Sequence, residues 1–174
     1  MAVQNYWNNL TNNPPQATPA GQDAEYSNTG IRPHILENSA SVAAADSSGS
    51  TYLLFKNVPW NARLRELKLE NDNLGAGAQI QIGLADSRTG TIISATCLSA
   101  AQSAAAANGK NAPLDGLAAL THAQTLQALY ETALDTPIPP QGPYRFNYDV
   151  VMTLSTAGGS AGVVTARGIL TPAG

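Results

Sequence analysis

Hydrophobic and polar positions between residues 51 and 86 alternate with a period of two, which is the spacing of a half-buried β-strand. The side chains of Ile80, Ile82 and Leu84 would share one face of a strand, and the glutamines between them would lie on the other. Three such runs occupy the stretch. We expect them to form an antiparallel meander with one solvated face, onto which the rest of the chain is built.

Turn residues separate these runs. Residues 57–61 contain Pro59, which lacks the N–H that a strand needs and therefore ends the first run. Residues 71–77 are rich in Asn and Gly, which tolerate a left-handed backbone. A further turn is predicted at residues 87–90, before a fourth strand over residues 91–98.

The most regular alternation lies near the end of the chain, in residues 144–156. After a glycine-rich turn, residues 163–171 return as the last strand, so we expect a closing hairpin. We also expect the apolar positions of residues 148–154 to pack across the fold against those of residues 80–84. With another strand over residues 35–45, about seven strands predict an all-β antiparallel sandwich or jelly roll.

Two segments depart from the strand pattern. Residues 121–134 are predicted to form one short helix, because Thr121 and Gln124 make a capping box and apolar residues follow at the spacing of one helical face. Residues 99–116 begin with an alanine-rich run. We expect them to form a surface excursion that is helical in part at most.

The beginning of the chain has a different composition. Residues 1–35 are rich in Asn, Pro and Gly and show no apolar periodicity, so we divide the chain into an extended N-terminal arm, 1–35, and a β-sandwich domain, 36–174. The arm carries isolated large side chains that are typical anchors for binding a partner. These residues are Tyr6, Trp7, Leu10 and Tyr26. The alternative is that Tyr6 and Trp7 fold back onto the chain's own domain.

The charge content restricts the classes of partner. Only 12% of the residues are charged, Lys and Arg total 9, and the formal net charge is -3. Nucleic-acid binding through phosphate neutralisation is therefore not expected. No apolar run has the length of a membrane span, and the first ten residues lack the basic and apolar regions of a signal peptide. Small neutral polar residues dominate instead, and such a surface suits packing against other protein chains.

No pattern of catalytic or metal-binding residues was found. His34 and His122 have no second ligand at metal-binding spacing. Residues 71–77 lack the alternating oxygens and closing glutamate of a calcium loop, so we interpret them as a turn. The single cysteine, Cys97, excludes an intrachain disulfide and is interpreted as a small buried apolar residue. We expect neither enzymatic activity nor a cofactor.

Several short motifs occur in a characteristic order along the chain. They are Val-Pro-Trp-Asn-Ala-Arg-Leu-Arg-Glu-Leu-Lys-Leu-Glu-Asn-Asp-Asn-Leu at 58–74, Ile-Gln-Ile-Gly-Leu-Ala-Asp at 80–86, Ala-Gln-Thr-Leu-Gln-Ala-Leu-Tyr-Glu at 123–131, Tyr-Asp-Val-Val-Met-Thr-Leu at 148–154, and Ser-Ala-Gly-Val-Val at 160–164. In this order they resemble tailed-phage head decoration, or cement, proteins. Ala85 stands where that family often has a tyrosine, and residues 1–27 match least.

The resemblance implies a structural protein of the virion that binds the outside of a phage capsid and stabilises it. The implied partners are the major capsid protein and further copies of the chain, as a homotrimer or alternatively a dimer, with no nucleic acid and no membrane. The implied location is the capsid surface, after synthesis in the host cytoplasm. The alternative is a non-enzymatic carbohydrate- or receptor-binding sandwich of a phage tail or fibre, for which Trp60 is the candidate aromatic.

Overall fold

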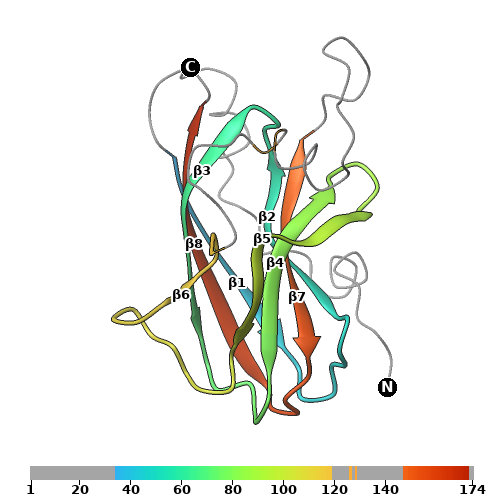
Figure 1. Ribbon diagram of the computed structural model, residues 1–174, viewed down its shortest axis with the longest axis vertical. Coiled ribbons are helices and arrows are strands. Elements are labelled where there is room, and N and C mark those ends of the chain that lie inside the picture. The colour runs from blue at the N-terminus through green and yellow to red at the C-terminus, as the bar shows by residue number, and fades with distance from the viewer. Residues whose placement is uncertain (1–33, 119–125, 127, 129–146, 173–174) are drawn as a thin grey trace.

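The computed structural model describes residues 34–118, 126, 128 and 147–172, and within them eight strands form two antiparallel sheets that pack face to face (Figure 1). The strands are β1 (His34–Val42), β2 (Thr51–Val58), β3 (Ala62–Asn71), β4 (Gln79–Asp86), β5 (Ile92–Ser103), β6 (Leu114–Asp115), β7 (Tyr148–Thr156) and β8 (Gly162–Pro172). The strand order is β1-β8-β3-β6 in one sheet, called sheet A below, and β2-β7-β4-β5 in the other, called sheet B.

This strand order is that of a jelly roll. β1 pairs with β8, β2 with β7, β3 with β6 and β4 with β5, so the chain resembles one long hairpin that has been rolled up into two sheets. Two of these pairings, β1 with β8 and β2 with β7, link strands from opposite ends of the described chain. The prediction of an all-β antiparallel sandwich or jelly roll is confirmed.

The predicted meander and closing hairpin are wrong. β2 and β4 lie in sheet B but β3, between them in sequence, lies in sheet A, so both breaks cross from one sheet to the other. β7 and β8 likewise belong to different sheets. Of the expected neighbours along the chain, only β4 and β5 pair directly. The alternation predicts which side chains point inward, but the inward faces of the two sheets have the same pattern, so it does not assign a strand to a sheet.

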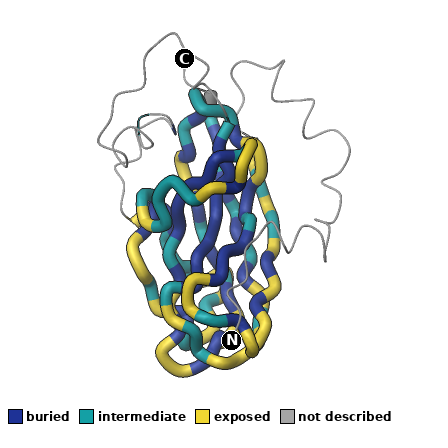
Figure 2. The backbone as a smooth tube through the Cα atoms, turned by 90° about the vertical axis from the view of Figure 1, so that its right-hand side faces the viewer, coloured by how far each residue is buried: buried dark blue, intermediate teal, exposed yellow. Residues whose placement is uncertain are grey.

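The core lies between the two sheets, and buried positions follow the middle of the strands while exposed ones gather at the ends and edges (Figure 2). The inward faces of β4 and β7 are neighbours within sheet B, with Ile82 opposite Met152 in the ladder. They do not pack across the sandwich as predicted. Sheet A provides the facing layer, which includes Leu64, Leu67, Leu69, Val164, Ala166 and Leu170.

β5 accounts for a second difference from the sequence prediction. Residues 99–103, expected to form an excursion, belong to this strand. Ser99 pairs with Ile82 and Ser94 pairs with Leu84, so five steps along β5 span two steps along β4. The additional residues bulge away from the ladder, and residues of β5 contact β7 on the far side of β4.

The bulge lies over the outer face of sheet B. A Cβ on Gly83 would lie 1.9 Å from the carbonyl oxygen of Ser94, so only glycine allows this approach of the backbone. Beside it, Ala85 and Val151 point away from the core and are nevertheless fully buried, with Leu53 and Ile92 packed against them. The prediction of one solvated face is therefore wrong for sheet B.

The two sides of the sandwich are closed by amide side chains. Asn38 on β1 donates from Nδ2 to the carbonyl oxygen of Leu54 on β2, at 2.8 Å. Gln102 on β5 donates from Nε2 to the carbonyl oxygen of Asp115 on β6, at 2.6 Å. These bonds connect the edge strands of sheet A with those of sheet B and occupy carbonyl groups that an edge strand would otherwise expose.

The predicted helix is only partly within the described residues. Leu126 and Ala128 are helical, and Leu126 is fully buried in the main core. The rest of residues 121–134, the arm up to residue 33, and residues 144–146 of the predicted last hairpin lie outside the described part of the chain. Among the described residues, no helix is long and apolar enough to cross a membrane.

Candidate functional site

The predicted anchor residues of the arm, Tyr6, Trp7, Leu10 and Tyr26, lie outside the described residues, so their role stays a prediction. His122 lies outside as well. His34 begins β1, but its side chain is not described. A functional site must therefore be sought on the sandwich itself.

The described sandwich offers little for catalysis or metal binding. Within residues 34–118 and 147–172, no group of three or more His, Cys, Asp or Glu could hold a metal ion. The oxygens of the 71–77 turn are engaged by backbone N–H groups, since Asn73 accepts from Gly75 at 2.8 Å and Asp72 accepts from Val163 at 2.8 Å. The interpretation of this segment as a turn is confirmed.

The remaining singled-out side chains, Cys97 and Trp60, belong to the packing of the domain. Cys97 is half-buried, and desolvation by burial raises the pKa of its thiol to about 11, so the thiol stays protonated at neutral pH. Trp60, the aromatic that a carbohydrate site would use, is half-buried and packs against the main core. Neither residue forms an exposed binding position.

The outward face of sheet A is not covered by another strand of the described domain. Whereas β5 covers sheet B, the outward positions of β1 are open, and Ile35 has an exposed fraction of 74%. Val163, at the start of β8, is 40% exposed. Large aliphatic side chains at this exposure are compatible with a protein contact. We call this surface the open face.

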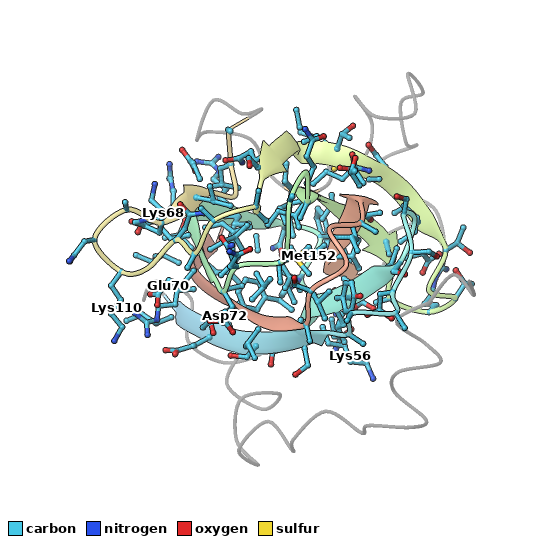
Figure 3. The ribbon with its side chains drawn as sticks, turned by 90° about the horizontal axis from the view of Figure 1, so that it is seen from below. Lys56, Lys68, Glu70, Asp72, Lys110 and Met152 are labelled. Carbon is cyan, nitrogen blue, oxygen red and sulfur yellow. The ribbon has the colours of Figure 1, made fainter. Side chains whose placement is uncertain are left out.

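A row of charged side chains crosses the open face from one edge to the other. Glu37 on β1 lies opposite Arg167 on β8, Arg167 lies opposite Lys68 on β3, and Lys68 lies opposite Asp115 on β6. The row therefore reads negative, positive, positive, negative across four strands. Figure 3 shows Lys68 and Glu70 on the same side of the molecule, both from β3.

Ion pairs connect the members of this row. Arg167 contacts two carboxylates, that of Glu37 at 3.3 Å and that of Glu70 at 3.0 Å, and Lys68 lies 3.8 Å from Asp115. Side-chain exposures of 22% to 56% mean that water screens these pairs, so each is worth only ~0–1 kcal/mol. The row is thus a weak source of stability. It holds charges at fixed positions, which favours orientation and specificity in a protein contact.

Hydroxyl, aliphatic and further charged side chains surround the row on the open face, among them Glu70 opposite Thr165 and Glu66 opposite Ile169. The hydroxyl groups of Ser39 and Thr165 lie 2.9 Å apart on the next outward row of β1 and β8. On the other side of the charged row, Ile35 lies opposite Ile169. Fixed charges, hydroxyls and a few aliphatic side chains on a flat sheet form a surface that can bind another protein.

The charged row cannot be recognised from the sequence alone. The sequence shows only that Glu66, Lys68 and Glu70 alternate with Leu67 and Leu69, which would put the three charged side chains on one face of a strand. Glu37, Asp115 and Arg167 are far from this strand in sequence, and only the pairing of four strands brings them into line.

Comparison with known proteins gives a likeness in fold. No family model matches the sequence, and no curated protein matches it. Among solved structures, a chain from the capsid of Ralstonia phage GP4 is 14% identical, with a TM-score of 0.50, over 83% of this chain and 87% of that one. A chain from the capsid asymmetric unit of cyanophage Pam1 is 17% identical, with a TM-score of 0.49, over 82% of this chain and 87% of that one. At this identity the GP4 likeness shows a shared fold alone.

Proposed function

We propose that this chain is a structural protein of a phage virion that binds the outside of the capsid and stabilises it, as a decoration or cement protein. The observation that carries the proposal is the jelly-roll order of the two sheets, which is a recurrent architecture of viral capsid domains. The fold likeness to a chain from the GP4 capsid supports it. The order of the short motifs between residues 58 and 164, which resembles that of head decoration proteins, supports it independently.

The geometry of the sandwich suits such a role. A protein that reinforces a shell needs a rigid body and a surface with fixed complementarity, and no reactive group. Asn38 and Gln102 bridge the two sides of the sandwich, which favours a rigid body, and the open face provides the surface. We propose that the open face rests on the major capsid protein, with the charged row setting its orientation.

The charged row also argues against one mode of self-association. In one arrangement, two copies stack their open faces and are related by a two-fold axis parallel to the strands. Lys68 of one copy would then face Arg167 of the other, and Asp115 would face Glu37. If the two-fold axis instead ran perpendicular to the strands, within the plane of the contact, each charged residue would face the same residue of the other copy. Both arrangements oppose like charges, which is unfavourable at a contact. The homotrimer proposed for this chain, or the alternative dimer, would therefore use other surfaces and leave the open face for the capsid.

The test is addition of the purified protein to preformed phage heads that lack it, followed by measurement of bound protein and of the heads' resistance to heat and osmotic shock. Lys68→Glu reverses one charge of the row, and Lys56→Glu makes the same change at an exposed position on β2. We expect the wild type and Lys56→Glu to bind and protect alike. Lys68→Glu should bind more weakly.

Two results would contradict the proposal at different levels. If the wild type neither binds heads nor raises their resistance, the decoration function is wrong. If it binds but the two variants bind equally well, the decoration function stands and the open face is not the capsid contact. Melting each variant beforehand would show that both are folded.

A further inference from the structure

The loop between β5 and β6 is fastened to the end of β3 by a pair of asparagines. Asn71 and Asn108 exchange two backbone hydrogen bonds of 2.8 Å as an isolated bridge. The Nδ2 of Asn108 also donates to the Oδ1 of Asn71 at 3.0 Å and to the carbonyl oxygen of Ala106 at 3.1 Å. Asn71 is 5% exposed and its own Nδ2 donates to carbonyl oxygens of the loop, including that of Ala106 at 2.9 Å. We call this arrangement the asparagine clamp.

The residue after the clamp is Gly109, within the one Asn-Gly sequence of the chain. Gly109 is exposed, and no atom lies within 4 Å of the position that a Cβ would take. Its carbonyl oxygen accepts from the N–H of Ala112 at 3.0 Å, and among the described residues no hydrogen bond is found for its own N–H. Asn108 is thus followed by an unhindered backbone amide that is not held by the fold.

We propose that Asn108 is a site of spontaneous deamidation that releases the asparagine clamp. The backbone nitrogen of Gly109 attacks Cγ of Asn108, a bond from that nitrogen to Cγ forms, and the bond from Cγ to Nδ2 breaks. Nδ2 leaves as ammonia, with the proton from the Gly109 nitrogen accounting for its third hydrogen. Water then opens the cyclic imide at either carbonyl. The product is an aspartate, or an isoaspartate in which the main chain runs through the former side chain.

The product cannot make the two contacts of the clamp that Nδ2 of Asn108 donates. A carboxylate has no hydrogen to donate, so an oxygen at the former place of Nδ2 would face Oδ1 of Asn71 and the carbonyl oxygen of Ala106. The carboxylate and Oδ1 of Asn71 would then face each other without a donor between them, and one of them is charged, which destabilises the contact. The loop would be held less tightly to the end of β3. The same clamp retains the leaving nitrogen in two hydrogen bonds, so the reaction is slower in the folded chain than in a denatured one.

The experiment is storage of the folded, full-length protein at mildly alkaline pH, with peptide mapping that distinguishes asparagine, aspartate and isoaspartate. We expect both products at Asn108 before any other asparagine, formed severalfold faster as pH rises, because the attacking amide must lose its proton. Gly109→Ala should slow their formation severalfold without lowering the melting temperature, since a methyl group at 109 meets no atom.

The structural consequence is tested with two variants in the same loop. Asn108→Asp imitates one product, and Asn111→Asp makes the same charge change at an exposed asparagine. Asn108→Asp should lower the melting temperature by several degrees and accelerate hydrogen exchange at the amide of Asn71, and Asn111→Asp should do neither.

Three outcomes would overturn the inference. One is a folded protein that forms no product at Asn108 while a denatured sample converts. The second is an unchanged rate in Gly109→Ala. The third is equal behaviour of the two aspartate variants, which would show that the clamp does not hold the loop. None of these outcomes depends on whether the protein binds a capsid.

Discussion

At the scale of single residues, packing between the sheets dominates the energetics. Ile82 is 1% exposed and lies beside Met152 in the middle of sheet B, facing the core. Burying an aliphatic side chain of this size contributes ~1.5–3 kcal/mol. The partly exposed ion pairs of the open face contribute far less, so charges on this protein determine contacts and turns more than they determine stability.

Ile82→Ala tests the inward register of β4. Removing the side chain loses its transfer free energy and leaves a cavity, so the free energy of unfolding should fall by ~2–5 kcal/mol in denaturant melts. Gln81→Ala, at the next position and pointing outward, serves as the control and should change little. A fall below ~0.5 kcal/mol for Ile82→Ala would mean that the register is shifted by one residue.

Asp86→Asn tests a carboxylate that holds a turn. Arg88 donates to Asp86 from its side chain at 2.8 and 3.1 Å and from its backbone at 2.8 Å, and Gly90 takes the positive φ of 71° that closes the turn. Hydrogen bonding from Arg88 holds the pKa of Asp86 below its ordinary value, against the opposing effect of burial.

Because the native pKa of Asp86 is lower than the unfolded one, its contribution is present above the unfolded pKa and is lost as pH falls through the native pKa. Asp86→Asn should therefore lower the free energy of unfolding at neutral pH, and the gap from wild type should close in acid. In an Arg88→Ala background the same change should have a smaller effect at neutral pH. A gap that stays constant from neutral to acid pH would contradict this linkage.

At the scale of elements, the backbone polar groups of the edge strands need hydrogen-bond partners within the chain. β1 and β2 are the edge strands on one side of the sandwich, and β6 and β5 those on the other. Asn38 and Gln102 are the residues that bridge these sides. The bridges remove acceptors from edges that would otherwise pair with another chain.

Asn38→Ala tests this closure. The carbonyl group of the fully buried Leu54 would lose its partner, at a cost of ~1–3 kcal/mol in the free energy of unfolding. We also expect association at rising protein concentration, measured by light scattering, because the β2 edge becomes available. Ser41→Ala, an exposed position on the same strand, is the control. If Asn38→Ala melts and scatters like the control, the amide bridge has no structural role.

At the scale of the whole molecule, the fold joins the two ends of the described chain. β1 pairs with β8 over its full length, from His34 opposite Leu170 to Val42 opposite Gly162. The residues before His34 therefore lead directly into the edge strand of sheet A, beside the open face. We propose that the arm, with its predicted anchors, binds a neighbouring chain in the virion.

Deletion of residues 1–27 tests the arm. The deletion ends before β1, so the sandwich should melt at nearly the same temperature, while binding to phage heads or oligomer formation should weaken sharply. The double change Tyr6→Ala and Trp7→Ala should reproduce much of that loss, since aromatic anchors usually dominate such contacts. If the deletion instead unfolds the domain, the arm belongs to the domain's own core, and its proposed role in binding a neighbouring chain is wrong.

Local pattern was sufficient for the strands with regular alternation and for the turns between them. The alternation in residues 79–86 predicted that Ile80, Ile82 and Leu84 point inward, and all three are buried. The turn predicted at residues 87–90 is present. These features depend on side-chain period and on backbone preferences of a few adjacent residues, which is information that a single sequence contains.

Pairing between distant strands was decided by the tertiary structure alone. The inward face of a strand has the same pattern in either sheet, so nothing near β3 indicates that its partners are β8 and β6 and not β2 and β4. The crossing of β5 over Gly83 likewise depends on tertiary structure, because the backbone of Ser94 on β5 occupies the space beside this glycine of β4. The charged row needs four strands in register, from Glu37 to Arg167. The sequence by itself therefore determined the inward faces of the regularly alternating strands, but not the second half of β5 or the short β6. The two-sheet packing, which maximises burial of all those faces at once, determined the strand order, the covered face of sheet B and the open face of sheet A.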